Sequence, residues 1–365
     1  MGVLVDHQIA ALTEGSSPSI RLDKKFIQSC SADLPIGRVI RQVAGEPARN
    51  DQFRMESFLK HHTLNTLSVS RRAVTIVPGH TYVVELSVEF SLPNGVFVYF
   101  NPKSSSGRNG LHAKVICDGG QEYDILSKGY TGKVYAVVTP RVFPVELVAG
   151  DSLVQARFID GQREFLRGRE LEHWDRQLPL VTNPGAKAQI IDDSLVLHLN
   201  LKTFPSNLVA NRGGGPIPLR KRGALDPQDY FREKRLANGD LFLEEREFAL
   251  ACSEELVRVP RELCAEMVAY NPRHGDYRTH DAGFFDAGFG NGRDGEVAGA
   301  TVIFEITNFN VAATMFSHGQ RIASLIYERL EGVPQKVYGE GVSHYQGQQS
   351  IQTSKNFRPW ESRIT

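Results

Sequence analysis

The chain has 365 residues, more than a single small domain usually needs, which favours two domains of roughly 150 to 180 residues each. Hydrophobic residues make up 41% and charged residues 23% of the chain, as is typical of a water-soluble globular protein. Lys plus Arg (42) equals Asp plus Glu (42), and this zero net charge argues against a general nucleic-acid binder. A local anion site is compatible with the same balance.

The cysteines and the N-terminus indicate a cellular compartment. The four cysteines form no CxxC pair and have no histidine at zinc-ligand spacing, so we interpret Cys30, Cys117, Cys252 and Cys264 as free thiols. The first residues lack a basic region followed by an apolar core, and no run approaches 18 apolar residues. We therefore expect a cytoplasmic protein without a secretory signal or a membrane span.

In chain order, the predicted elements are mostly strands. A first helix is predicted from Asp6 to Leu12, with Asp6 as its N-cap. A second is predicted over residues 227–236, with Pro227 near its first turn. Short runs rich in β-branched and aromatic residues predict strands at 81–90, 133–139, 152–159, 299–309 and 321–330. Gly, Pro and Asn separate these runs at short intervals, which favours a compact barrel or jelly roll.

Two further stretches have unusual compositions. Residues 211–225 are rich in Gly, Pro and Arg, and we interpret them as an exposed loop or linker, although a basic loop can also cover a phosphate. The polar tail from residue 333 is of a kind that is commonly disordered unless it is tied down. Its aromatic residues Tyr338, Tyr345, Phe357 and Trp360 indicate that parts of it dock.

A loop that occurs twice indicates an internal duplication. Asn101-Pro102-Lys103-x4-Arg108 and Asn271-Pro272-Arg273-x4-Arg278 lie 170 residues apart. Flanking segments match in the same order, and Gly150 and Gly319 are 169 residues apart. We predict a mainly β protein of two tandem modules with few short helices. The first module spans residues 1–185, and the second spans 186–365, including the polar tail from about residue 333.

The two copies differ in the residues that can perform chemistry. The first loop combines Lys103 and Arg108 with serines and glycines, which suits an anion, although such a turn is often only a turn. Glu305 is a lone carboxylate within an apolar strand of the second copy, where the first copy has Val137. Glu305 is unremarkable if it faces solvent and a candidate proton shuttle if it faces a cleft.

This complementary loss predicts where one site forms. If a site takes its loop from one module and its glutamate from the other, the first loop with Glu305 completes it. The second loop with Val137 then gives an inactive combination.

These residues resemble the dCTP deaminase and dUTPase superfamily, and within it dCTP deaminase. Lys103-Ser104-Ser105-x-x-Arg108-x-Gly110-Leu111 resembles the family's Arg-Ser-Ser-x-x-Arg-x-Gly-Leu motif. Residues 286–290, Phe304-Glu305-x-x-Asn308 and residues 345–349 resemble its Asp-Pro-Gly-Trp-x-Gly turn, its Leu-Glu-x-x-Asn strand and its Tyr-Gln-Gly-Gln segment. The resemblance implies a distorted β-barrel or jelly-roll fold of the dUTPase type in each module.

The resemblance also implies roles for individual residues. Glu305 would be the general base that activates water for attack at C4 of cytosine. Ser104 and the carbonyl near Ala282 would hold that water, and Arg108 would keep Glu305 ionised. Asp286 would bind the deoxyribose 3′-hydroxyl. The remaining residues expected to bind the nucleotide are Lys103, Ser105, Ile303, His344, Tyr345 and Gln348.

The same resemblance implies the metals and partners. Magnesium would arrive on the triphosphate, and no protein-bound metal is expected. The H-x-E and P-C-x-x-C motifs of the zinc deaminases are missing from the sequence, so zinc chemistry is not expected. The expected small-molecule partners are dCTP, dUTP and, as an inhibitor, dTTP. Relatives usually form trimers of single modules, so this chain is a candidate homo-oligomer, with no nucleic acid or membrane partner.

Two other functions stay open at the level of sequence. A dUTPase, or a bifunctional enzyme that converts dCTP to dUMP, would use the same fold, with Asp286 recruited against the attacking water. Glu305 favours deamination, because a dUTPase needs no base near C4. A non-catalytic dNTP sensor would bind nucleotide tightly without turnover.

Overall fold

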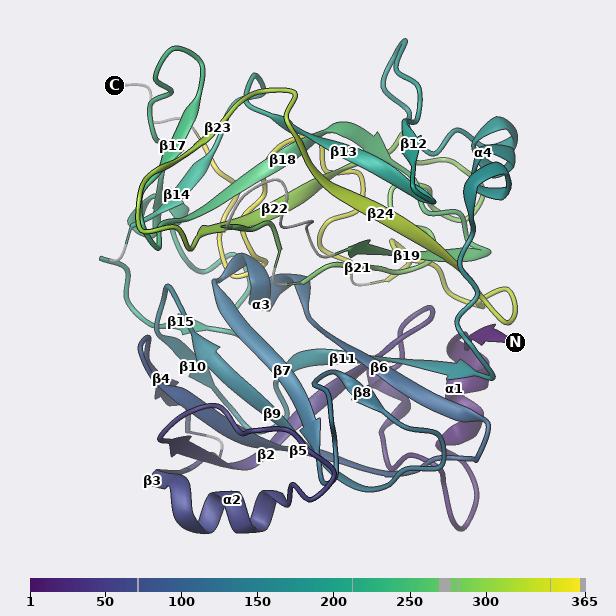
Figure 1. Cartoon of the computed structure of the whole chain (residues 1–365), viewed down its shortest axis with the longest axis vertical. Helices are drawn as coiled ribbons and strands as arrows, with labels where there is room; N and C mark the ends of the chain where they lie inside the picture. The colour runs from purple at the N-terminus through teal and green to yellow at the C-terminus, as the bar shows by residue number, and fades with distance from the viewer. Residues whose placement is uncertain (71, 212, 269–276, 281, 342, 362–365) are drawn as a thin grey trace. The chain divides into compact units, whose positions relative to one another are not determined.

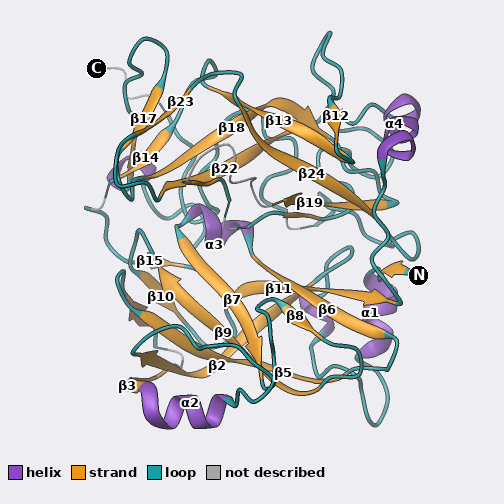
Figure 2. Cartoon of the chain, in the orientation of Figure 1, coloured by secondary structure: helices purple, strands orange, loops and turns teal. Residues whose placement is uncertain are grey.

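A computed structural model describes residues 1–361 except 71, 212, 269–276, 281 and 342. Strands dominate it and helices are few (Figures 1 and 2), so the predicted mainly β fold is confirmed. The chain divides into two compact units. Unit 1 comprises Met1–Arg163, Gly215–Lys221 and Leu330–Gln335, and unit 2 comprises the remaining residues. No helix among the described residues is long and apolar enough to cross a membrane.

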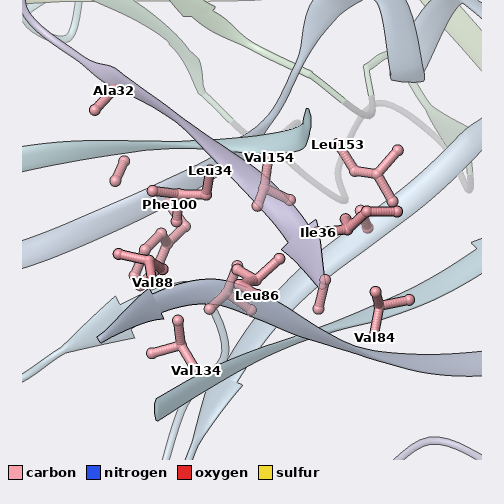
Figure 3. Close-up of a cluster of buried hydrophobic side chains, with 14 of the residues drawn as sticks. Ala32, Leu34, Ile36, Val84, Leu86, Val88, Phe100, Val134, Leu153 and Val154 are labelled. Carbon is pink, nitrogen blue, oxygen red and sulfur yellow. The ribbon is translucent and has the colours of Figure 1, made fainter. Parts of the chain in front are cut away.

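Unit 1 is built on a sheet whose main path runs β7-β9-β5-β2-β11-β6-β8. Its elements are β1 (Gly2–Val3), α1 (Asp6–Leu12), a 3-10 helix (Lys24–Phe26), β2 (Ala32–Val43), α2 (Met55–His62), β3 (Thr63–Ser68), β4 (Val74–Ile76), β5 (Thr81–Ser91), β6 (Val96–Pro102), α3 (Ser104–Arg108), β7 (Leu111–Cys117), β8 (Ile125–Leu126), β9 (Thr131–Pro140), β10 (Val145–Leu147), β11 (Ser152–Asp160) and β15 (Ile217–Pro218). Alternate residues of the long strands form the core, among them Leu34, Leu86 and Val154 (Figure 3).

Unit 2 contains the later elements. They are α4 (Gly168–Gln177), β12 (Ile190–Ile191), β13 (Ser194–Asn200), β14 (Leu208–Ala210), a 3-10 helix (Pro227–Asp229), β16 (Phe231–Arg232), β17 (Leu241–Leu243), β18 (Phe248–Val257), β19 (Leu263–Val268), β20 (Tyr277–Arg278), β21 (Phe284–Phe285), β22 (Ala300–Asn308), β23 (Thr314–Phe316) and β24 (Arg321–Arg329). Hydrogen-bonded pairs connect seven of these strands in the order β20-β22-β18-β13-β24-β19-β21.

The two units repeat one strand order. The strands of each seven-strand path can be ranked by their order in the chain. Strands of the same rank occupy the same position in both paths, so that β7 corresponds to β20 and β8 to β21. A two-stranded ribbon also recurs, as β4–β10 and β17–β23. Gly150 and Gly319 have positive φ angles of 88° and 74° in the turns before β11 and β24. The predicted duplication is therefore confirmed by topology.

The strand register also aligns individual residues of the two copies. Val83 follows the start of β4 by nine residues, and Leu250 follows the start of β17 by the same number. Val83 pairs with Val137, and Leu250 pairs with Glu305. Val137 is thus the counterpart of Glu305, as the sequence predicts.

The same register corrects the alignment of the repeated loops. Asn101 pairs with Gln155 in unit 1. The counterpart of Gln155 in unit 2 is Ser324, and Ser324 pairs with Val268. Arg278 pairs with Thr307, which places it level with His112 rather than Arg108. The predicted match of Arg108 with Arg278 therefore differs from the strand register, and the predicted match of Asn101 with Asn271 stays a prediction. Residues 271–276 lie outside the described part of the chain.

The five predicted strands are confirmed, but the helices need correction. The first helix has the predicted bounds, but its N-cap is Val5, and Asp6 is the first helical residue. The second is only a 3-10 turn over Pro227–Asp229, because Phe231 leaves it to pair with Ala210 in β14. Three helices were not predicted, namely α2, α3 and α4.

Segments from the second half of the sequence complete unit 1. Residues 215–221 are not simply a solvated linker, since Ile217 pairs with Val145 of β10 and Leu219 enters the core of unit 1. Near the C-terminus, Leu330 forms a bridge with Val3, and the Gln335 amide donates to Asp6 Oδ1 at 3.0 Å.

The division of the chain also differs from the predicted boundary at 185–186. The residues from 164 to that boundary belong to unit 2. Leu166, Leu171 and Leu180 lie in the core of unit 2, and Phe165 forms a bridge with Glu328. Because these residues pack into the core of unit 2, unit 2 begins at Glu164, before the predicted boundary.

Candidate active-site residues in each unit

The first half-site is the loop between β6 and β7 in unit 1. Lys103 is the N-cap of the short helix α3, and the Ser106 and Gly107 amides donate to its carbonyl at 2.8 and 3.1 Å. This turn buries Ser105 and Arg108 and leaves Lys103 and Ser104 partly exposed. Gly110 ends the loop with φ of 63°, and a Cβ there would lie 2.2 Å from Val142 Cγ2. Glycine is therefore required where the chain turns into β7.

Lys103 already has a partner in unit 1. Its ammonium donates a hydrogen bond to Asp33 Oδ2 on β2. The side chains of Lys103 and Asp33 are 22% and 13% exposed, so this ion pair is largely shielded from water. Asp33 was not singled out in the sequence, because it stands between the apolar residues Ala32 and Leu34 in an ordinary alternating strand.

The second half-site is centred on β22, all nine residues of which are buried. Ala300, Val302, Phe304 and Ile306 point into the core of unit 2. By alternation, Thr301, Ile303, Glu305 and Thr307 lie on the opposite face. Glu305 is 2% exposed, and a carboxylate on this face is therefore buried without being part of the apolar core.

Backbone groups hold Glu305 in place. The Ala282 N–H donates to Glu305 Oε2 at 3.0 Å, and the Glu305 N–H donates to the Thr279 carbonyl at 2.9 Å. A hydrogen bond from an amide to a carboxylate is charge-assisted and favours the ionised form. Two residues predicted to share a site, Ala282 and Glu305, are thus brought together.

Asp286 begins a glycine turn in unit 2. The Phe289 amide donates to the Asp286 carbonyl at 3.1 Å, and Gly288 and Gly290 have φ angles of 91° and 65°. A Cβ on Gly290 would lie 2.1 Å from the Val257 carbonyl oxygen, so the turn packs directly against β18. Asp286 itself is 9% exposed.

The C-terminal tail docks on this turn through Gln346. Its Oε1 accepts from the Gly290 amide at 2.8 Å, and its Nε2 donates to the carbonyls of Gly288 and Tyr338 at 2.9 and 3.0 Å. The ring of Tyr338 also packs at a tilt against that of Phe289, with centroids 5.5 Å apart and an interplanar angle of 56°. Gln346 was missed as a site-building residue, although the tail motif that contains it was the available signal.

The other predicted tail residues lie beside the start of β22. Gln348 is 2% exposed and forms two hydrogen bonds with Thr301. The Gln348 side-chain Nε2 donates to the Thr301 carbonyl at 2.7 Å, and the Thr301 amide donates to the Gln348 carbonyl at 2.8 Å. Tyr345 enters the core of unit 2, and its hydroxyl accepts from the Lys355 amide at 3.2 Å. The His344 ring lies 5.8 Å from that of Tyr345. The predicted docking of the tail is confirmed within unit 2, and Phe357 adds contacts to Tyr230 and Phe231.

The counterpart of the Glu305 face in unit 1 is apolar. Val137 is 1% exposed and belongs to a cluster of Val43, Phe53, Met55, Val83 and Ile116. Helix α2 contributes Met55, Phe58 and Leu59 to this cluster and lies beside β3 (Figure 1). Where unit 2 keeps a buried carboxylate, unit 1 has a second hydrophobic layer.

Within unit 1, the structure gathers Lys103, Ser104, Ser105 and Arg108 on one short loop. Within unit 2, Ala282 contacts Glu305, Gln348 contacts Thr301 at the start of β22, and the turn after Asp286 binds Gln346 of the tail. Each half-site contains residues of the types that a deaminase of the predicted kind needs.

Both halves of the chain match domains of one class of nucleotide-modifying enzymes. The model of the 2′-deoxycytidine 5′-triphosphate deaminase (DCD) N-terminal domain matches residues 1–162, and that of the C-terminal domain matches residues 167–357. The chain therefore belongs to the dCTP deaminase family.

Known structures and sequences agree with this assignment. The crystal structure of 2′-deoxycytidine 5′-triphosphate deaminase from Agrobacterium tumefaciens superposes with a TM-score of 0.82 at 28% identity. The match covers 90% of this chain and 99% of that one. The "dCTP deaminase, dUMP-forming" of Methanobrevibacter smithii is 27% identical over 149 residues, 38% of this chain and 69% of that protein. The protein of the same name from Methanothermobacter thermautotrophicus is 26% identical over 153 residues, 39% of this chain and 73% of that protein.

Proposed function

We propose that this protein deaminates dCTP, releasing ammonia and leaving a uracil base. The observation that carries the proposal is Glu305, a buried carboxylate held by the Ala282 amide on the non-core face of β22, in a chain of the dCTP deaminase family. The proposal also requires that the loop carrying α3 and the strand carrying Glu305 serve one nucleotide.

In the proposed reaction, Glu305 removes a proton from water as the oxygen bonds to C4 of cytosine. The electron pair of the C4–N3 double bond moves to N3, which receives the proton from Glu305. The exocyclic C4–N bond then breaks, and the amino group takes the remaining hydroxyl proton and leaves as ammonia as C4 becomes a carbonyl. Ser104 and the Ala282 carbonyl would hold the water, and Arg108 would keep Glu305 ionised and stabilise the developing charge. The hydrogen bond from the Ala282 amide favours the same ionised state of Glu305.

The remaining residues would bind the substrate. Asp286 would accept from the 3′-hydroxyl, and Ile303, His344 and Tyr345 would border the nucleoside. Lys103, Ser105 and Gln348 would hold the triphosphate. None of these three side chains is a carboxylate, so magnesium would stay on the phosphate oxygens as part of the substrate.

A second function concerns the product. The two relatives from Methanobrevibacter smithii and Methanothermobacter thermautotrophicus are named as dUMP-forming, which favours testing whether this chain also hydrolyses the triphosphate. Incubation with dCTP and magnesium, followed by assay of dUTP, dUMP, ammonia and pyrophosphate, separates the cases. Ammonia with dUTP indicates deamination alone, and ammonia with dUMP and pyrophosphate indicates the bifunctional reaction. Tight dCTP binding without either product would contradict both and favour a nucleotide sensor.

A further inference from the structure

A row of three polar side chains, one buried and two partly buried, crosses the sheet of unit 1 beside the serine loop. Strand β11 lies between β2 and β6, and its Gln155 pairs with Asp33 on one side and Asn101 on the other. Residues paired in this way lie on the same face of a sheet. The adjacent row, Ala32, Ala156 and Phe100, belongs to the hydrophobic core. The polar row therefore faces away from that core, whose residues Ala32 and Phe100 are drawn in Figure 3.

Lys103 extends from the end of this row. It lies two residues beyond Asn101, and its ammonium is bound to Asp33 Oδ2. The other carboxylate oxygen, Asp33 Oδ1, is buried and has no hydrogen-bond partner among the described residues. Leaving a buried carboxylate oxygen unpaired is unfavourable, so local packing alone does not explain an aspartate at this position.

The second copy of the fold provides an internal comparison. Its corresponding row is Val196, Ser324 and Val268, paired in the same register across β13, β24 and β19. The carboxylate is therefore not required by the strand pairing itself. Asp33 occurs in the copy that has the Lys-Ser-Ser loop, and an apolar residue replaces it in the copy that lacks the serines.

We propose that Asp33 is a positioning residue that holds the Lys103 ammonium at the start of α3 for the triphosphate. A free lysine side chain has several rotatable bonds, and ordering it on binding is unfavourable. The ion pair with Asp33 orders the chain before the substrate arrives, in a setting shielded enough for the pair to persist. This inference rests on the proposed function, in which Lys103 contacts the triphosphate.

A double-mutant cycle tests the proposal. Asp33→Ala, Lys103→Ala and the double variant are compared with the unaltered protein by steady-state kinetics with dCTP and by calorimetric binding of inorganic tripolyphosphate. Asp33→Ala is expected to raise the KM for dCTP and the Kd for tripolyphosphate about tenfold, with kcat within about twofold, a coupling usual for contacting residues. The double variant should be no worse than Lys103→Ala alone, because Asp33 acts through Lys103.

Two further variants make the result decisive. Asp33→Asn keeps the size and one acceptor oxygen, so its KM should lie between those of the unaltered protein and Asp33→Ala. Glu85→Ala removes the partner of Lys133 in an exposed ion pair of the same unit and should leave both constants unchanged. An unchanged or lower KM for Asp33→Ala and Asp33→Asn, or fully additive effects in the double variant, would overturn the proposal.

The calorimetric arm separates this inference from the proposed function. If the unaltered protein leaves dCTP unreacted, the deaminase proposal fails, while tripolyphosphate binding still decides the role of Asp33. If dCTP is deaminated but the cycle shows no coupling, the role of Asp33 fails and the deaminase proposal stands.

Discussion

At the scale of single residues, Glu305 and Val137 show how two copies of a strand have diverged. Both occupy the same register position on a buried strand. One is a carboxylate fixed by a backbone amide, and the other is a methyl-bearing side chain within an apolar layer. A charge at a buried position is unfavourable unless it is hydrogen-bonded, and the Ala282 amide meets that requirement for Glu305.

The first prediction concerns the proposed base. Glu305→Gln keeps the side-chain length and an oxygen that can accept from the Ala282 amide, but it removes the proton acceptor. We expect deamination to fall at least about a thousandfold while dCTP binding stays within a few-fold, because general-base catalysis contributes on this scale. Ammonia release measures the first quantity and titration calorimetry the second. Normal turnover in this variant would contradict the assigned role.

The second prediction compares two arginines. Arg108 lies in the buried helix α3, whereas Arg278 lies on β20 opposite Thr307, level with His112 of the first copy. Arg108→Ala should reduce kcat/KM for dCTP by about a hundredfold or more, and Arg278→Ala should change it only a few-fold. Thermal unfolding of both variants controls for misfolding. Equal losses of activity would show that the second copy's arginine also serves a site.

At the scale of elements, Gln346 is one of the side chains that hold the tail to the rest of unit 2. Gln346 makes three hydrogen bonds, which connect the glycine turn after Asp286 with Tyr338 and the tail. Because Gln348 and Tyr345 are near neighbours in the chain, the position of the predicted nucleotide-binding residues depends on this connection.

The third prediction tests that connection. Gln346→Ala removes the three hydrogen bonds and should destabilise the docked tail by roughly 2 kcal/mol. Hydrogen exchange of the amides at 344–358 should accelerate accordingly, since local opening sets their protection. Gln349→Ala is the matched control, because Gln349 is exposed and its two hydrogen bonds are longer, 3.2 and 3.3 Å. Similar acceleration in both variants would contradict the special role of Gln346.

The long strands could be predicted because their β-branched and aromatic runs are unambiguous, as in residues 81–90 and 299–309. The helix expected after Pro227 could not be excluded from sequence, because the pairing of Phe231 with Ala210 overrides local preference. Glu305 and the serine loop were recognisable as motifs. Asp33 was not, because its meaning depends on the cross-strand register that brings it to Lys103.

At the scale of the whole molecule, the duplication distributes the proposed chemistry over two copies. The serine loop belongs to unit 1, and Glu305 with the docked tail belongs to unit 2. In unit 1, the face that corresponds to that of Glu305 is filled by side chains of α2 and its neighbours. A chain of two modules is therefore expected to provide one functional set of residues.

The fourth prediction asks whether that set comes from a single chain. Arg108→Ala and Glu305→Gln each damage a different half-site, and the two variants are co-expressed with different affinity tags and purified together. If one chain supplies both half-sites, the mixture should show no more activity than the separate variants. Recovery of a substantial fraction of the unaltered activity would show that neighbouring chains complete the site.

The interleaving of the two units has a consequence for how the protein is made. Residues 215–221 add a strand and a core leucine to unit 1, and Leu330–Gln335 add the bridge to Val3 and the contact with Asp6. During synthesis, the first unit is therefore complete only after residue 335 has left the ribosome, when nearly all of the second unit is also available. The first half of the gene does not encode the whole of unit 1, so fission of the gene between the repeats would leave the first product without these two segments.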